Sequence, residues 1–208
     1  MKRRKNLHSD KTIRNVSKNC EPVEEIPLVH VTSVGLARDI LKSGKLEPAH
    51  CKVFNRNLVY LFVARPDFKM RGSEDKTEHL SYFPVSLVFK PSAASRPFHV
   101  YPFDTGGAAN GAFDELADEY VFLEDYELEA NLEGARRHIA WAFGSTRAYY
   151  EGEVDSSLID TLPEFAASSR SFIRIAGMSS SKSNRPDRIS GRRLNVFFID
   201  GILFGSIN

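Results

Sequence analysis

Apolar residues recur at two different spacings along this chain of 208 residues, and the spacings predict strands together with a few helices. Runs rich in β-branched and aromatic residues predict strands, because these side chains fit a pleated, half-buried surface. Apolar residues three and four positions apart predict amphipathic helices. On this basis the strands are 27–32, 57–64, 83–91, 98–104, 171–177 and 194–205, and the helices are 34–43 and 124–144.

Capping and turn residues mark the ends of some of these elements. Ser33 is a suitable N-cap and Gly44 a suitable C-terminal glycine for the helix over 34–43. Asp200 and Gly201 interrupt the last strand, and such a pair between apolar runs predicts a tight hairpin. Polar and glycine-rich composition predicts loops over 66–82 and 179–193.

The predicted elements indicate an α+β fold with strands in the majority, without the regular βαβ alternation of a doubly wound fold. Hydrophobic residues make up 42% of the chain, enough to form a core, and the length suits one domain. Residues 1–18 hold seven Lys or Arg against one acid and lack apolar periodicity. We therefore expect a basic tail over 1–20, flexible or only locally helical, and a single domain over 21–208.

Composition limits the classes of partner. The net charge of +1 gives no evidence for nucleic-acid binding, although the basic segments 1–18 and 182–193 leave contacts with phosphates open. No apolar run approaches the roughly 20 residues of a membrane span. No apolar segment follows the basic first residues, so they do not fit a secretory signal. Cys20 and Cys51 provide neither a disulfide framework nor a metal-ligand spacing. We expect no membrane partner, no bound metal and a cytoplasmic location.

Three polar clusters have both a structural and a functional interpretation. The glycines of "DTGGAANG", 104–111, fit a turn better than a phosphate-binding loop, because no following lysine accompanies them. Glu151 and Glu153 would share one face of an extended segment as paired carboxylates, or else lie in an exposed acidic loop. Four acids at helical spacing fit a solvated helix face, although with Asp104 they leave a metal-dependent nuclease as an alternative. These four are Asp114, Glu115, Asp118 and Glu119.

His30 and Thr32 are unusual because they lie two apart in the apolar strand "LVHVT". Side chains alternate across a strand, so an imidazole and a hydroxyl share one face. A single histidine on an apolar strand is commonly a structural residue bonded to a neighbour. Tyr60, however, adds an aromatic ring in the apolar strand "NLVYLFVA". Together they could form a cleft in which His30 and Thr32 bind ribose hydroxyls or a carboxamide and Tyr60 stacks on a flat cationic heterocycle.

The stretch "LVHVTSVGLARDILKSGKLEP", 28–48, resembles the opening of the ADP-ribosyltransferase superfamily, in the branch with a His–Tyr–acid triad. It is most similar to bacterial DNA ADP-ribosyltransferase toxins and RNA 2′-phosphotransferases. "NLVYLFVARP" is similar to the strand that carries the family's tyrosine, and the resemblance covers residues 27–106. It implies a split β-fold, mixed and mostly antiparallel, that binds NAD⁺ in a cleft between two half-sheets.

The resemblance also implies roles for individual residues. His30 would hold the nicotinamide ribose, Thr32 would support His30 or the carboxamide, and Tyr60 would stack on the nicotinamide. Gly44 and Asp104 lie in the resembling segments and complete the expected cofactor-binding set. NAD⁺ would be a substrate, and the protein a toxin or defence effector that transfers ADP-ribose to a nucleic acid or a protein.

The family's catalytic glutamate, which begins a late strand, has no direct counterpart in this chain. In "DRISGRRLNVFFI" Asn195 stands at that place if Leu194 and Val196 take the flanking apolar positions. An asparagine can neither act as a base nor carry negative charge against an oxocarbenium ion. Three interpretations remain open. Another acid takes the catalytic role, or the chain binds a nucleotide without catalysis, or the late strand aligns with the family in a different register. The other candidate acids are Glu153 and Glu151, then Asp187 and Asp200.

Overall fold

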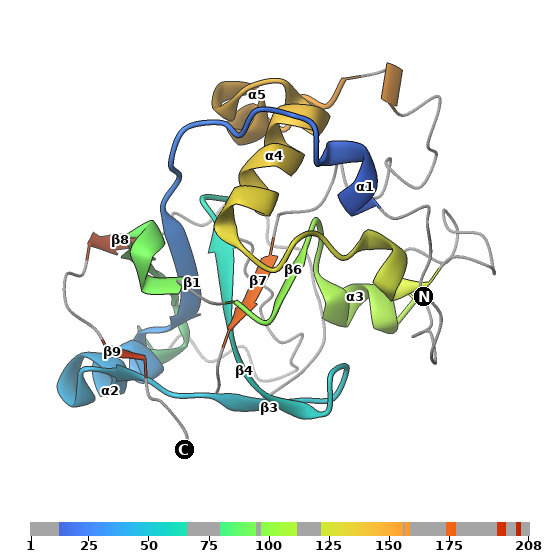
Figure 1. Ribbon diagram of the computed structural model, residues 1–208. Coiled ribbons are helices and arrows are strands. Elements are labelled where there is room, and N and C mark those ends of the chain that lie inside the picture. Colours follow the sequence, from blue (N-terminus) through green and yellow to red (C-terminus); the bar gives the residue numbers. More distant parts are fainter. Residues whose placement is uncertain are drawn as a thin grey trace.

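Strands form the centre of the molecule and helices lie around them (Figure 1). The computed structural model describes residues 13–65, 80–94, 97–111, 122–155 and 157–158, and the backbone of three strands beyond them. The strands are β1 (Leu28–Ser33), β2 (Lys45–Leu46), β3 (Ala49–Cys51), β4 (Arg56–Val63), β5 (Pro84–Phe89), β6 (His99–Tyr101), β7 (Arg174–Gly177), β8 (Asn195–Phe198) and β9 (Leu203–Phe204). The α-helices are α1 (Ile13–Ser17), α2 (Val34–Ser43), α3 (Thr105–Ala109), α4 (Leu132–Phe143) and α5 (Thr146–Glu151), and the 3₁₀-helices are η1 (Leu80–Tyr82), η2 (Pro91–Ala94) and η3 (Leu123–Tyr126).

One large sheet has the strand order β6–β7–β4–β1–β5–β8, and β3 pairs with β4 beside this path. Every described pairing in this sheet is antiparallel, except that β5 and β8 are parallel. The short strands β2 and β9 form a separate parallel pair. The predicted α+β class, with a mixed and mostly antiparallel sheet, is therefore confirmed.

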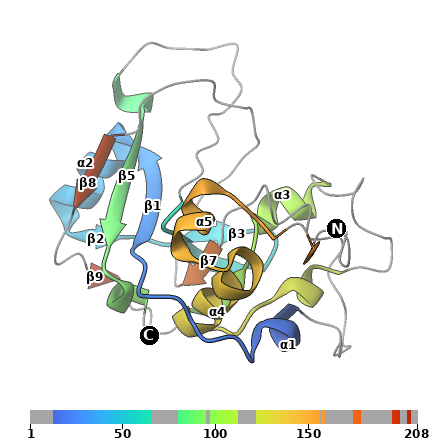
Figure 2. The same cartoon turned by 90° about the horizontal axis from the view of Figure 1, so that it is seen from above.

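The two strands at the centre of the sheet pair over a short stretch. The described pairs between β1 and β4 join Leu28 with Val63 and Val29 with Phe62. In contrast, β1 pairs with β5 along all six of its residues. Within this one sheet, β8–β5–β1 and β4–β7–β6, called here the two half-sheets, therefore pair with each other only over the described residues near the beginning of β1. In Figure 2, β1 and β5 lie on the left, and β7 and β3 lie nearer the middle of the view.

Helices α4 and α5 pack against the half-sheet that contains β4 (Figure 1). Ala135, Ile139 and Ala142 of α4 are completely buried, and their spacing places them on one stripe of the helix. The Tyr149 hydroxyl of α5 donates to the Val63 carbonyl at 2.7 Å. This hydrogen bond ties α5 to the end of β4, the strand that carries Tyr60.

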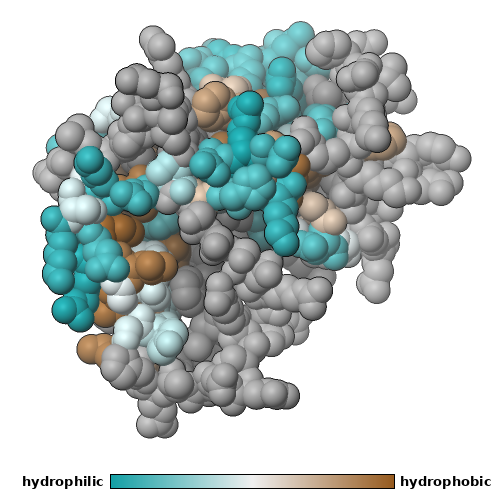
Figure 3. Space-filling model, turned by 90° about the horizontal axis from the view of Figure 1, so that it is seen from below, coloured by the Kyte–Doolittle hydropathy of each residue, from teal (hydrophilic) through white to brown (hydrophobic). Residues whose placement is uncertain are grey.

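The helix predicted over 34–43 is confirmed as α2, with both of its ends. The Ser33 side chain accepts a hydrogen bond from the Leu36 N–H, and Gly44 ends the helix with a φ of 65°, which glycine adopts without strain. Two leucines of α2, Leu36 and Leu41, remain more than half exposed. Figure 3 shows apolar side chains between polar ones on the side where Figure 1 places α2. Because Ser33 also ends β1, the cap fixes the end of the strand that carries His30.

The helix predicted over 124–144 is wrong in its first part. The chain there forms η3 and then a stretch that bonds to the sheet before α4 begins. The Leu128 N–H donates to the Val100 carbonyl of β6 at 2.9 Å, and the Leu128 side chain is completely buried. The Asn131 side chain accepts a hydrogen bond from the Gly134 N–H at 2.6 Å, which starts α4. Burial against β6 and a strong N-cap thus override the helical spacing upstream.

The hairpin predicted around Asp200 and Gly201 is also wrong. β8 pairs in parallel with β5, and β9 pairs in parallel with β2. Each strand satisfies its backbone groups on the edge of a different partner, so the two do not pair with each other. Asp200 and Gly201 themselves lie outside the described residues.

The predicted tail over 1–20 includes the short helix α1, and the residues before it lie outside the described part. α1 packs against α4, and its last residue, Ser17, is buried. The Arg14 guanidinium donates through Nε to the Glu127 carbonyl at 3.4 Å. The end of the basic segment is therefore attached to the domain. Of the two predicted loops, 179–193 lies outside the described residues and 66–82 is described only at η1.

Gly134 of α4 allows a stability prediction, because a side chain does not fit there. A Cβ atom added to Gly134 would lie 2.7 Å from the Glu129 Cβ and 2.9 Å from the Glu129 carbonyl oxygen. We expect Gly134→Ala to lower the free energy of unfolding by about 1–3 kcal/mol, although alanine favours a helix more than glycine does. Denaturation in urea measures the change. Gly106→Ala is the control, since its nearest neighbour would be Asp104 at 3.4 Å, and equal losses in the two variants would contradict the prediction.

Candidate functional site

His30 lies where β1 and β4 diverge, one residue beyond their last described pair. Its ring nitrogen Nδ1 is 3.0 Å from the carbonyl oxygen of Tyr60 on β4. Because a carbonyl can only accept, Nδ1 carries the proton in this hydrogen bond. In the neutral ring the remaining nitrogen, Nε2, is then an acceptor. The imidazole therefore spans the beginning of the gap between the half-sheets.

Thr32 follows on the same face of β1 and is 7% exposed. The sheet register pairs Thr32 with Val85 of β5 and Val85 with Asn195 of β8. Asn195 is the first residue of β8. Its backbone therefore lies in the row of Thr32, two strands and about 10 Å away. His30, Thr32 and Asn195 belong to one half-sheet.

Tyr60 belongs to the other half-sheet and is half-buried. Its hydroxyl donates to the Cys51 sulfur of β3 at 2.7 Å. Since Val29 and Phe62 are paired and side chains alternate, the Tyr60 ring continues the face of Phe62, whereas His30 belongs to the opposite face of β1. The structure thus brings the His30 ring to the Tyr60 backbone and the Tyr60 ring to β3.

The other predicted site residues have structural partners or lie elsewhere. Gly44 ends α2, and both carboxylate oxygens of Asp104 cap α3 by accepting from the N–H groups of Gly106 and Gly107. Glu151 ends a helix, where it pairs with Arg147 at 3.0 Å. Glu153 lies just beyond that helix and is exposed. The remaining candidate acids lie outside the described residues: Asp114, Glu115, Asp118, Glu119, Asp187 and Asp200.

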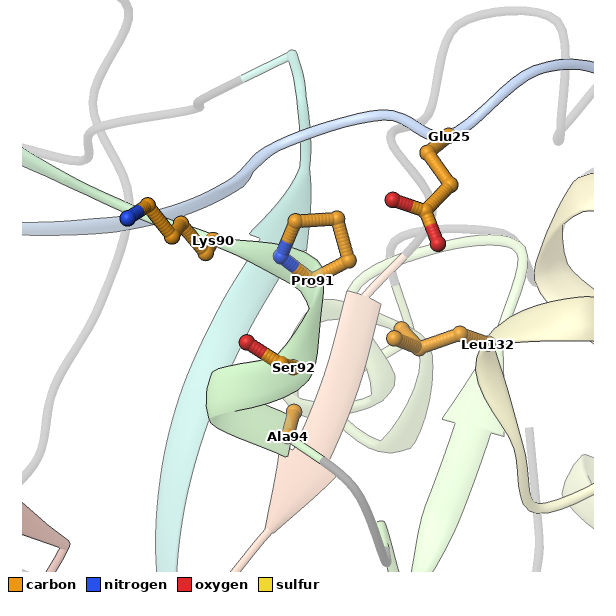
Figure 4. A pocket seen from close by; sticks show the side chains of 6 residues that line it. All are labelled: Glu25, Lys90, Pro91, Ser92, Ala94 and Leu132. Carbon is orange, nitrogen blue, oxygen red and sulfur yellow. The ribbon is translucent and has the colours of Figure 1, made fainter.

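A cavity of about 350 Å³ opens near the beginning of β1 (Figure 4). The Glu25 carboxylate points toward Leu132, whereas the Lys90 side chain extends away from the other lining residues. None of the predicted site residues lines this cavity, and nothing in the sequence pattern indicated it. Its lining consists of Glu25, Lys90, Pro91, Ser92, Ala94 and Leu132.

A second histidine with a fixed ring was missed by the sequence interpretation. His99 of β6 lies with Nδ1 2.7 Å from Oε1 of Glu127, and the two side chains are 21% and 20% exposed. Phe54 stacks on the imidazole at a centroid distance of 4.3 Å and an interplanar angle of 16°. His99 could have been noticed as a polar residue in an apolar strand. Glu127 carries no such signal, because its partner comes from a strand that is distant in the sequence.

Two negative findings apply to the described part of the chain. No group of three or more His, Cys, Asp or Glu side chains there is arranged to hold a metal ion. Among the same residues, no helix has the length and apolar character needed to cross a bilayer. The acids of the nuclease alternative lie outside this part, apart from Asp104, whose carboxylate caps α3.

Comparison with known proteins finds no match for this chain among family models, curated proteins or solved structures. Its function is therefore argued from the residues and geometry above.

Proposed function

We propose that the protein binds NAD⁺ where the two half-sheets diverge and transfers ADP-ribose from it. The observation that carries the proposal is the hydrogen bond from His30 Nδ1 to the Tyr60 carbonyl, at 3.0 Å across the diverging strands. The sequence resemblance assigned these same two residues to one NAD⁺ cleft. Their strands are neighbours and part beyond the Val29–Phe62 pair, which supports a cleft at this position. The proposed fold is accordingly an ADP-ribosyltransferase-like split sheet.

Each residue has a physical task in this proposal. His30 presents Nε2 as an acceptor for a hydroxyl of the nicotinamide ribose, because its other nitrogen is already donating. Tyr60 stacks on the nicotinamide ring, a flat cation that is attracted to the face of an aromatic side chain. Stacking uses the ring face and not the hydroxyl, so it is compatible with the hydrogen bond to Cys51. Thr32 supports the ribose side of the site from the face that it shares with His30. Because the Tyr60 ring belongs to the opposite face, the nucleotide passes between the diverging strands to contact both side chains.

The transfer step breaks the glycosidic bond between nicotinamide and ribose. Positive charge develops on the ribose as the bond lengthens, and a nearby carboxylate would stabilise that charge. Asn195 occupies the first position of β8, in the row of Thr32, and it provides a neutral amide in place of the carboxylate. We therefore expect slow turnover with the residues that are present.

A second candidate function, nucleotide binding without catalysis, is favoured by the same asparagine. A pocket that keeps His30, Thr32 and Tyr60 but lacks the acid would bind NAD⁺ or a derivative of it as a sensor. The two functions share the ligand and differ only in nicotinamide release. A cytoplasmic location suits both, because reducing conditions keep the Cys51 thiol available to Tyr60.

The acceptor of ADP-ribose is proposed to be a nucleic acid or a protein, as expected of a toxin or defence effector. Arg14 and Lys18 at the end of the basic segment add positive charge to α1 and the turn that follows it. Such charge attracts phosphates, and the attraction weakens as salt increases.

Calorimetric titration with NAD⁺ tests the proposed site. We expect His30→Ala and Tyr60→Ala each to weaken NAD⁺ binding by about tenfold or more, equivalent to about 1.4 kcal/mol. His30→Ala removes the hydroxyl acceptor, and Tyr60→Ala removes the stacking ring. The matched controls are His50→Ala and Tyr82→Ala, which change an exposed histidine of β3 and an exposed tyrosine of η1. Binding that is equally strong in all four variants would show that NAD⁺ does not use this cleft.

A further inference from the structure

His99 is hydrogen-bonded to Glu127 and lies on the same face of the sheet as the Tyr60 ring. The register pairs Tyr60 with Ala176 of β7 and Ala176 with His99 of β6. Residues in one such row project to the same face, so the Tyr60 and His99 side chains share a face and their backbones lie about 10 Å apart. The backbone of Ala176 lies between them in this row. By this register His99, and not His30, shares the face of the predicted nicotinamide platform.

The hairpin β3–β4 holds both rings. Cys51 accepts a hydrogen bond from the Tyr60 hydroxyl at 2.7 Å, and Phe54, in the turn between β3 and β4, stacks on His99 at a centroid distance of 4.3 Å. A stacked imidazole whose Nδ1 is bonded to a carboxylate has a fixed orientation. Contacts from this hairpin therefore hold both rings in place.

Glu127 determines which nitrogen of His99 is available for chemistry. Oε1 of Glu127 accepts from Nδ1 at 2.7 Å, so Nε2 bears the lone pair in the neutral ring. In the part of the chain that the structure describes, no protein group is hydrogen-bonded to Nε2. The two side chains are 21% and 20% exposed. A base nitrogen oriented by a buried or half-buried carboxylate is the arrangement that activates hydroxyl nucleophiles in many enzymes.

Two other charged groups approach this pair. Arg14 of α1 donates to the backbone carbonyl of Glu127 and not to its carboxylate. Arg56 of β4 lies over the ring of Phe98, the neighbour of His99, at 5.0 Å from the ring centroid. Neither guanidinium replaces the bond between Glu127 and His99, so the carboxylate remains the group that stabilises a protonated imidazole.

We propose that His99 is the general base of ADP-ribosyl transfer, that Glu127 is its positioning residue, and that the acceptor atom is a hydroxyl oxygen, of water or of the nucleic acid or protein that receives ADP-ribose. This inference rests on the proposed function. The acceptor oxygen forms a bond to the anomeric carbon of the ribose, and the bond from that carbon to nicotinamide breaks. Nicotinamide leaves as a neutral molecule with the electron pair of the broken bond. The proton of the acceptor hydroxyl moves to Nε2 of His99, and Glu127 stabilises the resulting imidazolium.

The test measures nicotinamide release by the full chain between about pH 5 and pH 9, with NAD⁺ binding measured in parallel by calorimetry. We expect His99→Gln to slow release by about 100-fold or more with NAD⁺ affinity changed by less than about twofold. Imidazole added to the buffer should restore part of the rate. Glu127→Gln should slow release less than His99→Gln does, with NAD⁺ affinity unchanged, because the imidazole loses the carboxylate that orients it. His50→Gln is the matched control and should behave as the wild type does.

Three results would overturn the inference. One is release by His99→Gln at the wild-type rate. Another is a slow His99→Gln variant that imidazole does not rescue, which would make the histidine structural. The third is an absence of nicotinamide release by the wild type at every pH. In that third case calorimetry shows separately whether NAD⁺ binds. Binding without release would overturn only the role of His99 as a base, whereas no binding would overturn the proposed function as well.

Discussion

Replacing Asn195 with glutamate is expected to raise nicotinamide release by about 100-fold or more. A carboxylate beside the anomeric carbon stabilises the positive charge that develops there, and one well-placed group contributes on the order of 3 kcal/mol. Asn195 begins β8, in the row of Thr32 and Val85, so the new side chain starts from the half-sheet that carries His30. A fixed-time assay of nicotinamide at saturating NAD⁺ measures the effect.

The control for Asn195→Glu is Asn57→Glu, which makes the same change of charge at an exposed position of β4. We expect no gain from this control, because the charge lies at the outer end of the β3–β4 hairpin. An equal gain in both variants would assign the effect to net charge and not to the site. No gain in Asn195→Glu, with NAD⁺ affinity intact, would place the acid elsewhere and make Glu151→Gln and Glu153→Gln the next variants to measure.

Stability is expected to fall below neutral pH because α4 buries a histidine. His138 is 1% exposed, and burial lowers its pKa from 6.5 to about 3. The folded chain therefore keeps His138 neutral while the unfolded chain binds a proton below about pH 6.5, so the unfolded state gains protons first. The stability that neutral His138 provides is complete above the unfolded pKa and is lost as the pH falls from about 6.5 toward 3, at up to about 1.4 kcal/mol per pH unit.

Urea denaturation at a series of pH values between about 7.5 and 4 tests this prediction. His138→Leu removes the titrating group at similar volume, so its free energy of unfolding should fall by about 3 kcal/mol less than that of the wild type over this range. His50→Leu, at an exposed position of β3, is the matched control and should retain the wild-type slope. Parallel curves for the wild type and His138→Leu would show that another group causes the acid sensitivity.

Local signals in the sequence were sufficient for the elements that bear the candidate site. Ser33 and Gly44 mark both ends of α2, because an N-cap and a left-handed glycine act within one helical turn. The β-branched and aromatic runs of β1, β4 and β5 were likewise sufficient to place these strands to within about two residues. The alternation of a strand was enough to put His30 and Thr32 on one face.

Pairing between distant segments was not predictable from such signals. The first part of the helix predicted over 124–144 does not form because the Leu128 N–H bonds to the Val100 carbonyl, and no local pattern reports that contact. The same applies to the site, where the partner of the His30 ring is a backbone carbonyl that any residue at position 60 would provide. His99 and Glu127 meet because β6 lies beside the stretch that follows η3, and the order of the strands determines that proximity.

A crystal structure of the full chain with bound NAD⁺ would test the central claim most directly. We predict that the nicotinamide lies against the Tyr60 ring and that a ribose hydroxyl lies about 3 Å from Nε2 of His30, on the opposite side of that imidazole from its bond to the Tyr60 carbonyl. NAD⁺ bound in the cavity between Glu25 and Leu132, with no ligand atom near His30 or Tyr60, would contradict the account.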